Sequence, residues 1–112
     1  MRIIELKDAA LSPNPHQVDA RRLYDTDNAQ VVHIMLKPGE SLKRHITPVD
    51  VFFYVLEGQG IVEIGDERES VGPDTLIESP ARIPHCLHNE GAGIFRVLVV
   101  KVPRPQESTK IL

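Results

Sequence analysis

The feature that most constrains the fold is a succession of short apolar runs separated by turn-forming residues. The clearest runs cover residues 31–36, 51–56 and 94–102, and they are rich in β-branched and aromatic side chains, which favour strands. Seven glycines and nine prolines fall mostly between the runs, so that turn signals recur about every 8–12 residues. This rhythm predicts an all-β protein, an antiparallel jelly-roll β-barrel with little or no helix.

The chain is expected to form one domain. Gly65-Asp66 is the clearest turn, a two-residue hairpin of the kind that matches strand twist. Residues 19–22 are the one stretch that could hold a turn of helix. The predicted organisation is an N-terminal part of strands and loop packed on the barrel (1–30), a barrel core (31–102) and a polar C-terminal tail (103–112).

Composition excludes several classes of partner. The net charge is −3 and only five residues are aromatic, whereas nucleic-acid binding needs a basic face with stacking rings. No apolar run approaches the ~20 residues of a membrane span. A single cysteine, Cys86, excludes an intrachain disulfide and fits a reducing compartment. We therefore expect a cytoplasmic protein with a small-molecule ligand and without nucleic-acid or membrane partners.

Two histidine-containing motifs carry a family resemblance. Gly39 is followed after five residues by His45 and then by the run YVLEGQG, and the later stretch 80–89 contains Pro84-His85 and ends at Asn89. Both motifs, and the hairpin between them, resemble the two conserved motifs of the cupins over residues 31–100. The resemblance implies a small jelly-roll barrel, commonly a homodimer, with its site in the barrel mouth.

The same resemblance implies a metal site that this chain keeps only in part. Two of the four liganding positions are His45 and His85, whereas the family's second histidine falls on Thr47 and its glutamate falls on Val51. Zinc and non-haem iron usually take at least three protein ligands. The prediction is therefore one weakly held divalent ion, with zinc, nickel, iron and manganese equally open.

A third ligand has two candidates in the sequence. Asp50 lies on the wrong face of an uninterrupted strand, but Pro48 could reset the alternation and turn it inward. His33 lies in the apolar run 31–36 and is typical of a satisfied core residue unless that strand faces the same interior as His45. Both alternatives remain open at this level.

Other side chains are assigned by alternation and composition. Cys86 and His88 have the opposite parity to His85 and should leave the interior, and His16 is expected to be exposed and inert. Glu63 is expected on a solvated outer face. The residues expected to line the ligand pocket are Thr47, Val51, Phe53, Arg82 and Leu87.

Three functions fit these residues. The first is a barrel that binds a small organic molecule, with or without the metal. The second is a metal-dependent small-molecule enzyme of the isomerase, decarboxylase or dioxygenase type, in which the ion polarises a substrate oxygen. The third is a metal-free barrel whose site has degenerated. Fold alone does not choose among them, because one fold hosts many activities.

Overall fold

The computed structural model describes all 112 residues and confirms the predicted antiparallel jelly roll. It contains no α-helix, and no helical segment has the length and apolarity needed to cross a membrane. One short 3-10 turn, η1 (Leu6–Asp8), precedes ten strands. These are β1 (Asp19–Thr26), β2 (Ala29–Leu36), β3 (Ser41–Ile46), β4 (Asp50–Glu57), β5 (Gly60–Ile64), β6 (Glu67–Val71), β7 (Leu76–Ser79), β8 (His85–His88), β9 (Phe95–Val102) and β10 (Lys110–Ile111).

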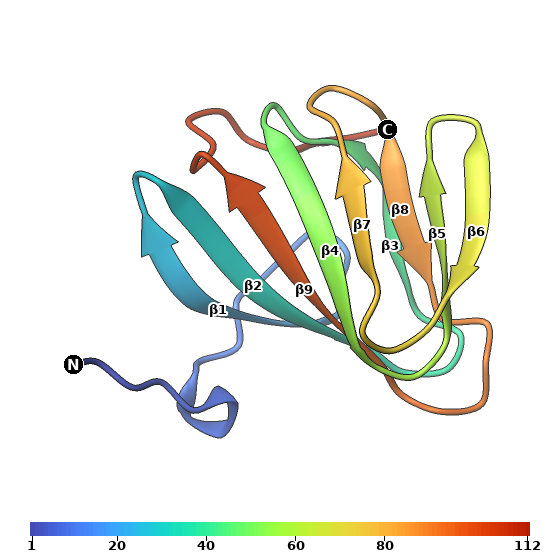
Figure 1. Cartoon of the computed structure of the whole chain (residues 1–112), viewed down its shortest axis with the longest axis horizontal. Coiled ribbons are helices and arrows are strands. Elements are labelled where there is room, and N and C mark those ends of the chain that lie inside the picture. The colour runs from blue at the N-terminus through green and yellow to red at the C-terminus, as the bar shows by residue number, and fades with distance from the viewer.

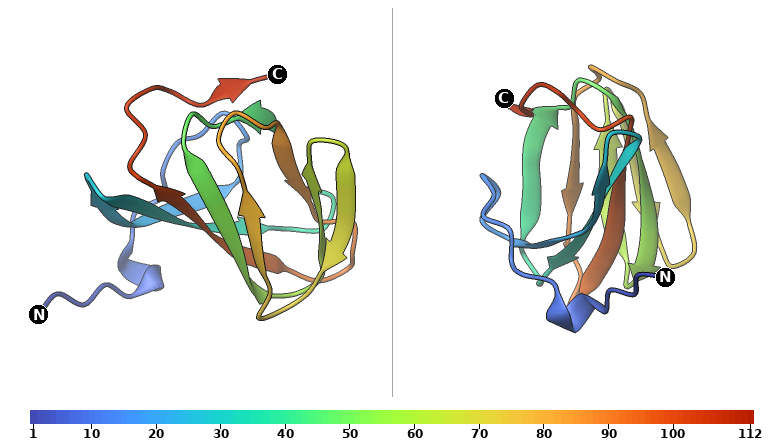
Figure 2. Two further views of the ribbon diagram at one scale, coloured as in Figure 1. Left: turned by 45° about the horizontal axis from the view of Figure 1, so that its top comes forward. Right: turned by 90° about the vertical axis from the view of Figure 1, so that its left-hand side faces the viewer.

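The strands form two five-stranded sheets that face each other (Figure 1). The first has the order β1-β2-β9-β4-β7 and the second the order β10-β3-β8-β5-β6, with all pairings antiparallel. The turned views show that the two sheets together form the barrel, and that the N-terminal segment extends away from it (Figure 2). Neighbours in each sheet are mostly distant in sequence, as in a jelly roll.

The core fills the space between the sheets because each strand points alternate side chains inward. On β4 the inward residues include Phe53 and on β9 they include Phe95, both almost fully buried. Burying one such ring stabilises the fold by about 2–3 kcal/mol. The buried cluster consists of Ala20, Ile34, Leu36, Leu42, Val51, Phe53, Val55, Val62, Val71, Leu87, Phe95, Val97 and Val99.

Two segments of the chain differ from expectation. Residues 19–22 were expected to allow a helical turn but lie in β1, where Ala20 is buried and pairs with Ile34 of β2. The segment 103–112 was expected to be a tail, yet Lys110 and Ile111 form β10 and pair with β3. Backbone pairing with an existing edge accounts for an ordered end that its polar composition does not indicate.

Strand β3 contains the irregularity that shapes the interior. Leu42 pairs with Leu87 and His45 pairs with His85, so that β3 has one residue more than β8 between the two pairs. This is a β-bulge, which inserts a residue and changes the direction of the following side chains. As a result Leu42 and His45 both point inward, although they lie three residues apart.

Candidate functional site: a histidine-lined barrel cavity

A cavity of about 180 Å³ opens into the barrel. The two sheets contribute to its wall together with the loop that precedes β1, and none of the lining residues carries a carboxylate. They are Ser12, Pro13, Asn14, Pro15, His16, Ala20, Arg22, Gln30, Val32, Ile34, Leu42, His45, Thr47, Phe53, His85, Val99, Lys101 and Thr109.

The backbone of Lys43, at the β3 bulge, binds two of the three imidazoles in this cavity. His45 Nδ1 lies 2.5 Å from the Lys43 carbonyl oxygen, and the Lys43 N–H donates to His16 Nδ1 at 2.8 Å. A bulge leaves backbone groups out of the ladder, and here two histidines satisfy them. The His16 and His45 rings are consequently neighbours, with centroids 4.8 Å apart.

The third imidazole, His85, meets His45 directly. Their Nε2 atoms are 2.9 Å apart and both side chains are buried. Ser79 Oγ lies 2.6 Å from His85 Nδ1, and the Thr47 hydroxyl lies 3.3 Å from His85 Nε2. The Phe53 and His85 rings pack in a T-shaped arrangement with centroids 5.3 Å apart. Every nitrogen of the two buried rings therefore has a polar neighbour.

The three imidazoles are neutral near pH 7. Burial, followed by repulsion from His45, lowers the pKa of His85 to about 3. Burial also lowers the pKa of His16 to about 4, with repulsion from His45 as the next cause. The pKa of His45 is lowered by burial too, although its hydrogen bond to the Lys43 carbonyl opposes this. Desolvation disfavours the charged imidazolium at all three positions.

Hydrogen bonding fixes the proton on two of these rings. A carbonyl oxygen only accepts, so His45 carries its proton on Nδ1 and presents a bare lone pair at Nε2. His16 accepts at Nδ1, so its proton lies on Nε2. His85 has two options: it donates from Nε2 to His45, or it donates from Nδ1 to Ser79 and leaves two lone pairs facing each other.

Positive charge lines the same cavity. Lys101, from β9, is half-buried and forms no ion pair, and burial lowers the pKa of its ammonium group, with repulsion from Arg22 as the second cause. Arg22 is exposed, and its guanidinium forms an ion pair with Asp25 at 3.4 Å. The interior thus combines one uncompensated ammonium group with three neutral imidazoles.

The structure brings together part of the predicted site. His45, His85, Thr47 and Phe53 all line the cavity. Val51 and Leu87 are buried in the core beside it but do not line it.

The remaining predicted residues lie elsewhere. His33 is buried among residues on the other face of β2, where its Nε2 accepts from Arg96 at 3.0 Å. Asp50 is exposed and accepts from the Ala81 N–H at 2.8 Å, so Pro48 does not turn it inward. Neither side chain approaches the two cavity histidines.

Arg82 is also outside the cavity. Its side chain is 68% exposed and reaches Glu107 at 4.0 Å. Its φ of 66° is left-handed, a conformation in which glycine is favoured. The positive charge beside the cavity therefore comes from Lys101 and Arg22 and not from Arg82.

Sequence reasoning missed His16, Lys101 and Ser79. The expectation that His16 is exposed and inert is wrong, since it is half-buried and lines the cavity. One signal was present: Asn14 is a residue type that organises turns, and its side chain accepts from the His16 N–H and donates to the Val18 carbonyl. Lys101 lies in a continuous apolar run, and only its register with Gln30 places it beside the cavity.

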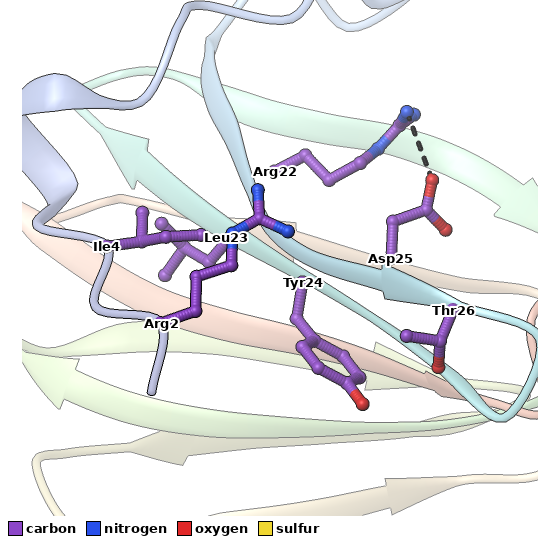
Figure 3. Close-up of a pocket in the computed structure, with 7 residues that line it drawn as sticks. All are labelled: Arg2, Ile4, Arg22, Leu23, Tyr24, Asp25 and Thr26. Carbon is purple, nitrogen blue, oxygen red and sulfur yellow. Dashed lines mark ion pairs between the residues drawn. The ribbon is translucent and has the colours of Figure 1, made fainter.

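A second depression lies away from the histidines. Arg2 and Ile4 of the N-terminal segment border it together with residues 22–26 of β1, and its volume is about 460 Å³ (Figure 3). The Arg22–Asp25 ion pair crosses one side of it. It has no cluster of converging titratable groups comparable to the barrel interior, which remains the better candidate site.

The fold and the cavity together define a small jelly-roll barrel with a histidine-lined interior. Residues 32–101 match the family model described as Cupin domain, and the chain therefore belongs to the cupin family.

Solved structures of similar shape agree with this assignment. The protein TT1209 of Thermus thermophilus is 32% identical, with a TM-score of 0.80 over 94% of this chain and 100% of that one. The polyketide cyclase RemF of Streptomyces resistomycificus is 23% identical, with a TM-score of 0.85 over 100% of this chain and 85% of that one. A predicted oxalate decarboxylase of Thermotoga maritima is 15% identical, with a TM-score of 0.81 over 99% and 100% of the two chains. The last two likenesses concern the fold alone, and one fold can serve many activities.

Proposed function

We propose that the barrel cavity binds a small organic molecule that carries a carboxylate or a comparable oxyanion. The observation that carries the proposal is the charge of the wall: Lys101 is half-buried there without an ion pair, and no lining residue is acidic. Removing a charge from water without a partner is costly. An anion in the cavity would supply the missing partner and restore the preference for the charged ammonium.

Neutral donors would complete the recognition. His16 carries its proton on Nε2, and the Thr47 hydroxyl lies beside His85. Both groups donate to an oxygen without adding charge. The volume of about 180 Å³ corresponds to roughly six water-sized groups, which indicates a compact acid and not a large cofactor.

The test is calorimetric titration with a panel of small mono- and dicarboxylates and their uncharged amides. We expect at least one acid to bind and its amide to bind at least tenfold more weakly. Lys101→Met should abolish this preference, whereas Lys37→Met, which alters an exposed lysine in a loop, should leave it unchanged. Equal binding of acid and amide, or an unaffected Lys101→Met variant, would contradict the proposal.

A weak divalent-metal site in the same cavity is the second candidate. His45 Nε2 has a free lone pair and lies 2.9 Å from His85 Nε2. The other nitrogen of His45 donates to a backbone carbonyl, as is usual for metal-bound histidine. His16 does not add a third ligand, because Lys43 occupies its Nδ1 and its Nε2 carries the proton. The donor set therefore fits a weakly held ion whose remaining positions are left to water or ligand.

Bound there, a divalent ion would polarise an oxygen of the organic ligand, which is the chemistry of the alternative enzymatic function. Ser79 would then accept from His85 Nδ1 and hold its ring in place, while the Phe53 ring packs against the same imidazole. Metal content of protein purified without chelator or histidine tag tests this, for the wild type and for His45→Ala. Substoichiometric metal that His45→Ala does not change would refute it and favour a metal-free barrel.

We also infer that the protein acts as a homodimer in a reducing cytoplasm. Exposed apolar side chains along the N-terminal segment and the β1 edge support the first part, including Ile3 at 77% and Tyr24 at 52% exposure. The single, unpaired Cys86 is compatible with the second. Light scattering of the wild type and of a chain lacking residues 1–5 would test the dimer, which should dissociate on truncation.

A further inference from the structure

Three side chains with different metal-binding atoms meet on the outer face of the second sheet, away from the barrel cavity. Along β8, His85 and Leu87 point inward, so Cys86 and His88 point outward as predicted. Glu63 of β5 is opposite Cys86 in the register and shares this outer face. The expectation that Glu63 is merely solvated is wrong, since its carboxylate contacts both residues of β8.

The ligand atoms of the three residues converge. Cys86 Sγ lies 3.2 Å from Glu63 Oε2 and 3.3 Å from His88 Nε2, and that carboxylate oxygen is also hydrogen-bonded to His88 Nε2. All three atoms are within 4.8 Å of one another. The other ring nitrogen, His88 Nδ1, is 2.8 Å from Ser41 Oγ, which orients the imidazole toward the cluster. Exposed fractions of 27% for Glu63 and 25% for His88 leave a path from solvent.

We propose that Glu63, Cys86 and His88 form a binding site for a thiophilic divalent ion such as zinc. Sulfur, imidazole nitrogen and carboxylate oxygen are the three zinc donors of proteins, and three ligands leave one position open for water. On binding, the thiol releases its proton to solvent, and the thiolate and carboxylate together balance the two positive charges. Ser41 serves as the outer partner that fixes the histidine ring.

A nucleophilic cysteine is the competing interpretation, and the geometry disfavours it. In such sites the base contacts the nucleophile through one ring nitrogen and an orienting group through the other. Here Ser41 contacts Nδ1 of His88 as an orienting group would, but the Glu63 carboxylate contacts Nε2 more closely than Cys86 does. The nitrogen that would have to deprotonate the thiol is therefore already occupied. Arg68 approaches Glu63 at 3.5 Å but also holds Glu90 at 2.8 Å, so it remains paired when an ion takes the carboxylate.

Cobalt(II) titration of the reduced, chelator-treated full chain tests the site. A thiolate–cobalt bond gives a charge-transfer absorption in the near ultraviolet that nitrogen and oxygen ligands do not. The barrel cavity contains no sulfur, so this band reports the outer site alone, whether or not the cavity binds metal. We expect the band to saturate at one equivalent in the wild type and in His45→Asn.

Variants then distinguish a site with three ligands from a single thiol that binds cobalt by itself. Cys86→Ala should lose the band, and Glu63→Gln and His88→Asn should each weaken cobalt binding by roughly tenfold or more. Ser41→Ala should weaken binding while retaining the band, which a purely structural role would not predict. Absence of the band in the wild type at tenfold excess of cobalt, or unchanged affinity in both Glu63→Gln and His88→Asn, would overturn the proposal.

Discussion

Acidification should destabilise this protein in a way that can be traced to His85. In the folded chain burial holds the pKa of His85 at about 3, whereas the ordinary value is 6.5. Between these values the unfolded chain binds a proton at this residue and the folded chain does not. The free energy of unfolding therefore decreases as the pH falls below 6.5, and the contribution of neutral His85 to stability is fully present only above that pH.

The size of the effect follows from the two pKa values. At pH 5 the unfolded His85 is about 1.5 pH units below its ordinary pKa and is protonated, whereas at pH 7.5 it is neutral. This protonation of the unfolded chain lowers the free energy of unfolding by about 2 kcal/mol. The lowered pKa values of His16 and His45 act in the same direction. With total stabilities of about 5–15 kcal/mol for such domains, a loss of this size is readily measured.

Urea denaturation between pH 7.5 and pH 5, in the presence of a chelator, is the appropriate assay. The wild type should lose at least about 2 kcal/mol, and His85→Gln should lose less, with its slope reduced by up to about 1.4 kcal/mol per pH unit. Leu87→Val is the matched control, because it truncates the inward neighbour on β8 and should shift the whole curve without changing its slope. A wild-type stability that stays constant over this range would refute the reasoning, as would an unaltered slope in His85→Gln.

Four substitutions test the backbone and the support of the site. Gly58→Ala should cost about 3 kcal/mol or more in thermal denaturation, because φ is +83° and a Cβ would lie 2.1 Å from a carbonyl oxygen. Gly93→Ala, with open space around it, should cost little. Arg82→Gly should stabilise by up to about 1 kcal/mol, since it relieves a left-handed φ of 66°; a lower midpoint would contradict this. Ser79→Ala removes the buried partner of His85 and should cost about 1–3 kcal/mol in urea denaturation; an unchanged midpoint would mean that water replaces the hydroxyl.

The fold was predictable because it depends on short-range patterns. Period-two alternation and regularly spaced turns specify strands that bury one face, and the Gly65-Asp66 hairpin joins β5 to β6 as predicted. Strand parity also located several side chains correctly. Phe53 faces the cavity, and Cys86 and His88 leave the interior.

The site was less predictable because it depends on a bulge and on a long-range contact. Strict alternation along β3 would put Leu42 and His45 on opposite faces, and only the extra residue between them turns both inward. His16 reaches the same place from a loop 27 residues away in sequence, through the Lys43 N–H that the bulge leaves free. No periodic pattern encodes either event, so a search restricted to strand positions considers His33 and Asp50 and overlooks His16.

The replacements inside the barrel change which charge it favours. The resemblance assigns a carboxylate ligand to the position of Val51, which is a buried core residue here. Without that negative charge, a divalent cation near His45 and His85 would lack a protein anion and would face the ammonium of Lys101 across the same cavity. Like charges repel each other strongly where water is scarce, and a divalent ion doubles the repulsion that a monovalent ion would meet. An anion entering the cavity is attracted by the same ammonium, and a metal ion is therefore best retained when an anionic ligand binds with it.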